Sequence, residues 1–460
     1  NKPCVGITTV VNGEYYVGYA GNGIGHHDSY VYNSDWPMPS TPTAPTSFAL
    51  GDVLGVAVDM DNGFVWFSIN NDWQNSGDPT STNAASNGAY GTGFVGETMF
   101  PAVSQTGSSH GFTAMANFGA RPFAYTPPTG YKALNTYNLP DPVITDPSKY
   151  FDASVYTGAG SSVDVSTNFS PDLVWVKSRV GVSSHNIIDS VRGDDNYLMS
   201  NSTDGEDDSY ADVLELNTDG YTVGSNNSAF SGTDGNVGWA WDAGTATSDT
   251  SATAGSIDGT NPTLPSDYRV NNDAGFSIVT WDGHGSTNET VAHGLNATPD
   301  FMICKKRSTG GNSWIVWHKE WANTKYAILN GMSAIATDAT LFNSHADLNS
   351  NTFSVGTNNS FSDTGDTAIA YLWSEVEGYS KFGAYTGNGL DDGPFVYCGF
   401  KPAFIMFGPN INYSDWYIYD NERWPNNPAE DPLAANETMT EANFDARLVT
   451  NHVDILSLIM

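Results

Sequence analysis

The sequence predicts an all-β protein with several domains, and three observations support this prediction. Long amphipathic runs of Ala, Leu, Glu and Lys are absent, which makes helices scarce. Tyr, Phe and Trp make up 13% of the 460 residues, and strands favour aromatic side chains. One β-rich motif recurs three times after residue 145. Because the chain is too long for one hydrophobic core, we expect three or four domains.

The first domain is expected over residues 1–140. Residues 51–59 alternate apolar and small side chains, Asp61-Asn62-Gly63 supplies a turn, and residues 64–69 return as a second strand. Asn70-Asn71 predicts a second turn. Two further strands are predicted at residues 100–103 and 112–118.

These segments resemble a SPRY domain. The resemblance rests on Gly51 to Asp61, Phe64 to Asn70, Met99-Phe-Pro-Ala-Val103 and Asn117-Phe-Gly119. It implies a bent β-sandwich whose loops bind proteins or other ligands. The stretch from Asn117 to Leu134 is similar to the version in long bacteriophage structural proteins, which usually opens with a Trp-Tyr-Trp-Glu strand. That first strand is missing before Val5-Gly6-Ile7, so we expect residues upstream or a strand supplied by another chain.

Three related antiparallel β-sandwich or barrel modules are expected next, each with its own core. We call them module 1 (148–245), module 2 (270–376) and module 3 (377–460), and a Ser/Thr/Gly-rich linker is expected at 246–269. Each contains a proline followed by an apolar strand, at Pro171, Pro299 and Pro402. An aromatic residue and a glycine turn precede each proline, and a second strand that starts near an aromatic ring follows it.

The third copy is expected to be incomplete. Modules 1 and 2 share Val223-Gly-Ser-Asn-Asn-Ser228 and Val355-Gly-Thr-Asn-Asn-Ser360, which module 3 lacks. We therefore expect further residues beyond Met460. Module 3 follows module 2 without a flexible linker, which predicts rigid packing of the two.

The modules resemble the β-rich repeats that follow SPRY-like domains in tail fibres and other virion proteins of marine bacteriophages. The residues concerned are the Tyr-Thr-Gly-x-Gly turns, the strands after the shared prolines, and Trp416 to Arg423. The resemblance implies a virion structural protein at the phage tail or particle surface. The first expectation is a tail fibre or receptor-binding protein that adheres to a host cell-surface glycan or protein. It also implies contacts with other virion proteins and a homo-oligomer, with a trimer as the first expectation.

Two alternatives stay open. One is a capsid or neck decoration protein with a purely structural role. The other is a polysaccharide depolymerase, which needs two carboxylates facing across a sugar. No catalytic residue is predicted, because no Gly-x-Ser-x-Gly elbow follows a strand and precedes a helix, and the glutamates are few and scattered. With 51 acidic residues, the sequence leaves a carboxylate pair open.

The net charge of −34 argues against nucleic acid and against an anionic membrane surface, because both require Lys and Arg, which number only 17. No transmembrane run or signal peptide is visible. The three cysteines have no zinc or disulfide spacing, and Cys304 lies in an apolar strand, where it is expected to pack in a core.

Two sets of candidate site residues emerge. Glycan binding needs aromatic faces beside polar groups, and the loop aromatics that offer them are Tyr30, Tyr32, Trp36 and Trp73. Trp66, Trp175, Trp314 and Trp416 are expected to pack in cores instead. Oxygen ligands on tight turns suit calcium, and the candidates are Asp204, Glu206, Asp207, Asp208, Asp391 and Asp392. Solvated turns are the alternative there, and no other cofactor is expected. His26-His27-Asp28 is expected to be a polar loop.

Overall fold

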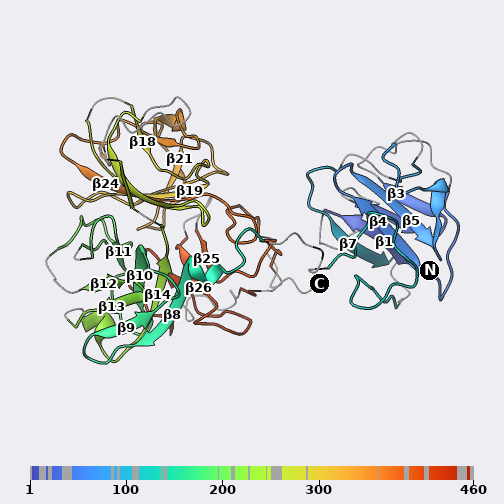
Figure 1. Cartoon of the computed structure of the whole chain (residues 1–460), viewed down its shortest axis with the longest axis horizontal. Helices are drawn as coiled ribbons and strands as arrows, with labels where there is room; N and C mark the ends of the chain where they lie inside the picture. Colours follow the sequence, from blue (N-terminus) through green and yellow to red (C-terminus); the bar gives the residue numbers. More distant parts are fainter. Residues whose placement is uncertain are drawn as a thin grey trace. The chain divides into compact units, whose positions relative to one another are not determined.

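The computed structural model describes residues 3–9, 17–18, 23–33, 44–83, 87–90, 94–105, 113–135, 138, 142–194, 196–208, 213–225, 228–244, 246–249, 262–285, 288–360, 362–387, 393–408, 414–442 and 453–455. It is nearly all β, with 4% helix and 36% strand, so the predicted fold class is confirmed. The chain divides into unit 1 (Asn1–Pro140) and unit 2 (Asp141–Leu458), and Figure 1 labels many of their strands. No helix in the described ranges is long and apolar enough to cross a membrane.

Unit 1 contains two antiparallel sheets. The first has the order β3-β2-β1-β7 and is formed by β1 (Pro3–Thr8), β2 (Gly23–His27), β3 (Tyr30–Asn33) and β7 (Phe100–Gln105). The second has the order β4-β5-β6 and is formed by β4 (Leu54–Asp59), β5 (Phe64–Ile69) and β6 (Asp72–Trp73), with the 3-10 helix Gln74–Ser76 after it. Ile7 and Ile24 of the first sheet pack with Val65 and Phe67 of the second. The two sheets therefore share one core, as in a sandwich.

The hairpin predicted in unit 1 is confirmed. Strands β4 and β5 pair from Leu54 with Ile69 to Asp59 with Phe64, and Gly63 takes a φ of 68° in the loop between them. Asn70 and Asn71 also have positive φ, in the turn that leads to β6.

Two further expectations for unit 1 meet different outcomes. Trp66 is fully buried, as predicted, and its Nε1 donates to the main-chain oxygen of Asn87 at 2.7 Å. The strand predicted over 112–118 is wrong for its described part, 113–118, which forms no strand and leaves Met115 77% exposed. Its alternating pattern meets no sheet edge that pairs with it, and pattern alone does not make a strand.

Module 1 is a two-sheet sandwich. One sheet has the order β11-β10-β14-β8 and the other β12-β13-β9. The strands are β8 (Phe151–Thr157), β9 (Val163–Ser166), β10 (Leu173–Ser178), β11 (Asn186–Asp189), β12 (Leu214–Asn217), β13 (Gly220–Val223) and β14 (Gly235–Trp241), with the 3-10 helix Pro147–Lys149 and helix α1 (Ser228–Ser231). The core between the two sheets includes Val174, Val176 and Tyr221.

Module 2 repeats this arrangement. The order β17-β24-β19-β20 within its eight-stranded sheet matches β8-β14-β10-β11, and the pair β18-β23 matches β9-β13. The strands are β15 (Ala246–Asp249), β16 (Ser266–Asn271), β17 (Phe276–Asp282), β18 (Glu289–Ala292), β19 (Phe301–Lys306), β20 (Ile315–His318), β21 (Lys325–Ile328), β22 (Ala336–Thr337), β23 (Thr352–Val355) and β24 (Thr367–Trp373), with the 3-10 helix Asn343–His345. Cys304 is fully buried in the sandwich core of this module, as predicted.

The stretch predicted as a linker, 246–269, does not act only as a linker. Strand β15 and the start of β16 lie within it, and they pair with each other from Ala246 with Arg269 to Asp249 with Ser266. β16 then pairs with β17, so both strands extend the sheet of module 2. The polar composition of this stretch suits an edge strand with one solvated face.

Module 3 contributes β25 (Phe404–Phe407), β26 (Tyr417–Asp420) and β27 (Leu433–Ala434), which form a sheet in that order. These strands correspond to β10, β11 and the segment of module 1 in which Leu198 bridges to Ile187. In module 2 the corresponding strands are β19, β20 and β21.

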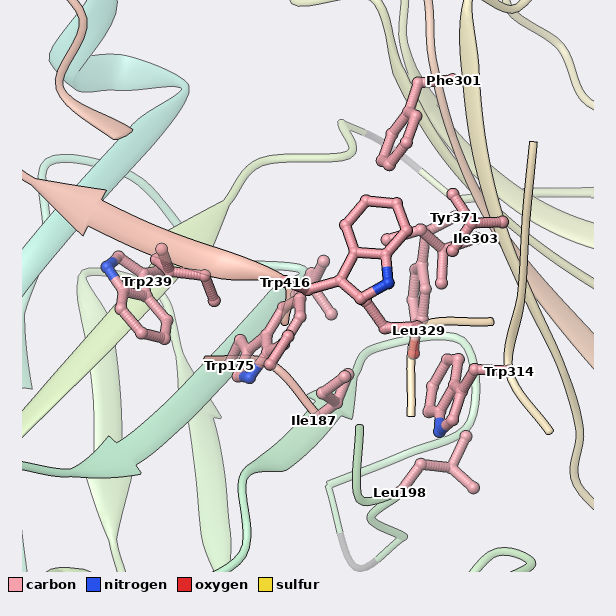
Figure 2. Close-up of a cluster of buried hydrophobic side chains, with 14 of the residues drawn as sticks. Trp175, Ile187, Leu198, Trp239, Phe301, Ile303, Trp314, Leu329, Tyr371 and Trp416 are labelled. Carbon is pink, nitrogen blue, oxygen red and sulfur yellow. The ribbon is translucent and has the colours of Figure 1, made fainter. Parts of the chain in front are cut away.

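The expectation that each module has its own core holds for modules 1 and 2, but it missed a core that the three modules share. Modules 1 and 2 keep separate sandwich cores, but a further cluster of buried side chains is drawn from all three modules. Figure 2 shows this shared core, in which Trp175 and Trp239 of module 1 lie with Trp314 and Tyr371 of module 2 and Trp416 of module 3. Burial of rings this large in one cluster favours a compact arrangement over an extended one.

Candidate functional site

The aromatic residues predicted to bind a glycan are only partly brought together. Tyr30 and Tyr32 lie on the short edge strand β3, and not in a loop as expected. They are two positions apart, so both side chains point to the same face of the sheet. Tyr30 is 63% exposed. Trp73 forms β6 in the other sheet and packs against Trp66 and its neighbours, while Trp36 lies outside the described residues.

The pair His26-His27 is in strand β2, and not in the polar loop that was expected. The ring of His26 lies against those of Phe48 and Phe67, and its Nε2 is 2.9 Å from the main-chain oxygen of Asp28. Burial lowers the pKa of His26, which keeps the ring neutral.

The acidic loop at 204–208 holds one carboxylate between two arginines. The Glu206 carboxylate accepts hydrogen bonds from Arg307, at 2.8 and 3.0 Å, and from Arg192 at 3.2 Å. Glu206 is therefore an ion-pair partner of both, and calcium binding by this loop stays a prediction. Asp207 accepts from the Tyr197 hydroxyl at 2.7 Å.

Asp204 and Asp208 are the other calcium candidates that the structure describes. Asp204 accepts from Ser202, and Asp208 is exposed. Asp391 and Asp392 lie outside the described residues. Among the residues that the structure describes, no three His, Cys, Asp or Glu side chains converge on a point that could hold a metal ion.

We expect EDTA to leave the melting temperature of unit 2 unchanged. The reason is that Glu206, which stands at the centre of the acidic loop, is already neutralised by Arg192 and Arg307. Differential scanning calorimetry with excess calcium and with EDTA checks this, because a ligand that binds only the folded state raises the melting temperature. A rise of several degrees in calcium would contradict it.

The most consistently repeated contacts in the molecule join the three modules to one another. His185, Trp314 and Trp416 occupy the same place in the repeat, just before β11, β20 and β26. Trp314 Nε1 donates to the main-chain oxygen of Met199 in module 1, and Trp416 Nε1 to that of Ile328 in module 2, both at 2.9 Å.

His185 makes the third contact of this set. Its Nε2 lies 2.9 Å from the main-chain oxygen of Ala434 in module 3. Because its Nδ1 accepts from Trp175 Nε1 at 2.8 Å, the proton must be on Nε2. The contacts run from module 2 to module 1, from module 3 to module 2 and from module 1 to module 3. They close a ring, and unit 2 is a pseudo-threefold assembly within one chain.

A second repeated contact fixes the same three residues inside their own modules. Their main-chain N–H groups donate to an asparagine side chain at 2.8–2.9 Å in each case, and these asparagines are Asn201, Asn330 and Asn436. Each asparagine lies two residues after the carbonyl that accepts the neighbouring module's ring N–H. One local geometry is therefore built three times.

Charged groups reinforce two of the three contacts in the ring. Arg192 binds Asp189 and the main-chain oxygen of Ile187, and Arg423 binds Asp420 and that of Ile418 in the same way. The side chains of both ion pairs are 0% exposed. Burial opposes the charge on each guanidinium, but the neighbouring carboxylates outweigh it and raise the pKa of both arginines.

Four carboxylates at these two contacts also bind side chains of the adjacent module. Arg179 of module 1 reaches Glu441 of module 3 at 2.9 Å, just as Arg307 of module 2 reaches Glu206. The Tyr371 hydroxyl donates to Asp189 at 2.7 Å, and Trp239 Nε1 donates to Asp420 at 3.0 Å. Tyr371 and Trp239 hold the same position on β24 and β14, since they pair with Ile303 and Trp175.

Residues 146–458 match the model of a family described as a domain of unknown function, DUF7483. The chain belongs to the DUF7483 family. No curated protein and no solved structure matches the chain. The match covers the three modules, so the closed ring is the structure of the DUF7483 region of this protein.

Module 2 of the DUF7483 ring differs from the other two modules at the positions of the buried ion pairs. His318 and Trp321 stand where modules 1 and 3 have the Asp and Arg of the buried pairs, and their rings are 5.7 Å apart. Ile335, which packs against the shared core, stands where the others have Glu206 and Glu441. Aromatic and apolar side chains of module 2 therefore take the positions of the charged ones, and the ring is not symmetric in its chemistry.

Proposed function

We propose that this protein is a structural protein of a phage particle surface, and that it presents loops to the host surface. The observation that carries the proposal is the closed ring, in which three copies of one module are joined by buried, directional contacts. Such contacts fix the modules relative to one another, which suits a support that holds surface loops in a constant geometry. Supports of this kind gain affinity when several weak sites act together.

The adhesive surface is proposed on unit 1. Tyr30 and Tyr32 share one face of the edge strand β3, and aromatic rings with polar tips are favoured at binding surfaces. A sugar stacks its C–H face on such a ring while its hydroxyl groups bind polar neighbours. The ligand class is therefore a cell-surface glycan, with a surface protein as the alternative. A homotrimer of chains is also part of this proposal, and sedimentation velocity of the 49.2 kDa chain tests it.

The adhesion proposal is tested by binding of the labelled full-length chain to a glycan array and to a panel of marine bacterial strains. We expect saturable binding that Tyr30→Ala weakens at least tenfold, because truncation removes the exposed ring. The matched control is Tyr385→Ala, an aromatic ring of similar exposure in unit 2. Equal loss in both variants, or no saturable binding to any strain or glycan, would overturn the proposal.

A capsid or neck decoration protein is the second candidate. The observation in its favour is the run Phe395, Val396 and Tyr397 in module 3, whose side chains are exposed. Exposed apolar patches commonly mark protein interfaces. Tight association of the chain with purified phage particles, together with absence of host binding, would favour this candidate over the first.

A further inference from the structure

Three buried oxygen atoms of module 1 have no hydrogen-bond partner among the residues that the structure describes. They are the hydroxyl oxygens of Tyr156 and Tyr221 and the side-chain oxygen of Asn236. Tyr221 is 1% exposed and Asn236 is 0% exposed. Buried polar atoms of folded proteins almost always have a partner, and an ordered water molecule commonly serves as one. The three atoms are therefore candidates for a shared ligand.

The strand register brings the three atoms to one place. Asn236 of β14 is paired directly with Tyr156 of β8, so their side chains lie on the same face of the sheet. Tyr221 reaches this face from β13 in the opposite sheet. A Cβ on Gly238, two positions from Asn236, would lie 2.0 Å from the Tyr221 hydroxyl oxygen. The glycine therefore leaves the space into which this hydroxyl group extends.

The Asn236 amide is held in one orientation. Its Nδ2 donates to the main-chain oxygens of Phe230 at 3.0 Å and of Asp234 at 2.9 Å, so its Oδ1 is the atom left to accept a hydrogen bond. Each tyrosine hydroxyl has one hydrogen to donate. The site thus offers two donors and one acceptor, a set that a single water molecule can satisfy.

Asp152 adds an acidic group to the same face of the sheet, because it is paired with Ala240 of the module 1 core. Its carboxylate accepts a hydrogen bond from the Ser154 hydroxyl. Burial raises the pKa of the Tyr221 hydroxyl well above its usual value, and the neighbouring Tyr156 and Asp152 act in the same direction. Tyr221 is therefore neutral and keeps the hydrogen that it can donate.

Module 2 has apolar side chains at the same places in the repeat. The equivalents of Tyr156, Tyr221 and Asn236 are Trp281, Phe353 and Ala368. The rings of Trp281 and Phe353 are in edge contact, with their centroids 5.4 Å apart. Direct contact between two rings thus closes the core of module 2 at the place where module 1 has three polar oxygen atoms.

We propose that the sandwich core of module 1 holds a structural water molecule, bound between Tyr156, Tyr221 and Asn236. The water accepts one hydrogen bond from each tyrosine hydroxyl and donates one to the side-chain oxygen of Asn236. It takes the place of the ring contact that closes the core of module 2. The proposal concerns the stability of module 1 and is independent of adhesion by unit 1.

The test compares Tyr156→Phe, Tyr221→Phe and the double variant in the full-length chain by urea unfolding. Each single variant should lower the equilibrium constant for folding of unit 2 about fivefold, the usual effect of losing one buried hydrogen bond. The double variant should lower it little further, because both hydroxyls bind the same water. The matched control is Tyr385→Phe, which should leave the constant unchanged because Tyr385 is 52% exposed.

The opposite result is expected if the hydroxyl groups have no ligand, because removal of an unpaired buried polar group leaves stability unchanged or raises it. Such a result in both single variants would overturn the proposal, and so would losses that simply add in the double variant.

A crystal structure of the full-length chain reads the site directly. We expect density for one water molecule within hydrogen-bond distance of all three oxygen atoms. Density for a side chain of the protein itself, or no density, would contradict the proposal. A melting temperature that rises in sodium or potassium chloride, but not in choline chloride at equal ionic strength, would assign the site to a metal cation and overturn the water. Host-cell binding by unit 1 is measured separately, so failure here leaves the adhesion proposal standing.

Discussion

Replacing Arg192 by methionine is expected to lower the free energy of unfolding of unit 2 by about 3–5 kcal/mol, the range for breaking a buried ion pair by removing one partner. The side chains of Arg192 and Asp189 are 0% exposed, so the variant leaves the Asp189 carboxylate buried without its counter-charge. It also removes a donor to Glu206 and to the main-chain oxygen of Ile187. Urea unfolding followed by tryptophan fluorescence measures the change.

The double variant Asp189→Asn with Arg192→Met should be measured beside the single variant. It removes both charges, so its loss in free energy of unfolding should be smaller than that of Arg192→Met alone. The exposed Arg121→Met in unit 1 is the control, and it should change stability by no more than about 0.5 kcal/mol. If Arg192→Met cost as little as this control, the ion pair would contribute nothing to the ring.

Two-sided burial explains why the sequence predicted the strands but not the ring. All six residues of β10 and of β19 are buried, although an ordinary sandwich strand has one solvated face. One face of β10 packs into the core of module 1 through Val174 and Val176, and the other into the shared core through Trp175. In the local sequence this arrangement appears as the continuous apolar runs after Pro171 and Pro299. They show that a second covering layer is needed but not which segment supplies it.

The ion pairs between the modules could not be predicted from the sequence for a related reason. Glu206 stands in a run of acidic residues, so its local surroundings favour a cation, but its partner Arg307 is 101 positions away along the chain. No local pattern reports such a contact. The sequence did contain a signal, because an Asp-x-x-Arg motif begins at the last residue of the second strand in modules 1 and 3, at Asp189 and Asp420. Repetition of a charged pair at one place in a repeat indicates a shared buried role.

Replacing His185 by tryptophan, the residue at the same position in the other two modules, is expected to destabilise unit 2 by about 1–3 kcal/mol. The loss is expected because the Trp175 ring lies 5.8 Å from that of His185, which leaves little room for a larger ring. The Trp175 Nε1 would also lose its hydrogen-bond acceptor. Module 2 has Ile303 opposite Trp314 at this place. The double variant His185→Trp with Trp175→Ile reproduces that pair, so it should recover most of the loss.

The same double variant should alter the dependence of stability on pH. Burial lowers the pKa of His185 well below its usual value, and the nearby cations Lys177 and Arg423 act in the same direction, while the main-chain oxygen of Ala434 opposes them. A depressed histidine pKa gives stability that is complete above the unfolded-state value near 6.5 and is lost as the pH falls below it. One pH unit below that value, the loss from His185 is on the order of 1 kcal/mol.

Other buried groups titrate in the same range but cancel in the comparison. His293 and His345, each with a pKa lowered by burial to about 4, add to the loss in both proteins. Asp172 has the opposite sign, because burial raises its pKa to about 6 and its contribution grows as the pH falls. Urea unfolding at pH 7.5, 6.5 and 5.5 should therefore show a shallower decline in the double variant than in the original chain. Parallel declines would mean that His185 takes up a proton as readily in the folded chain as in the unfolded one, which would contradict its assigned role as the neutral donor between modules 1 and 3.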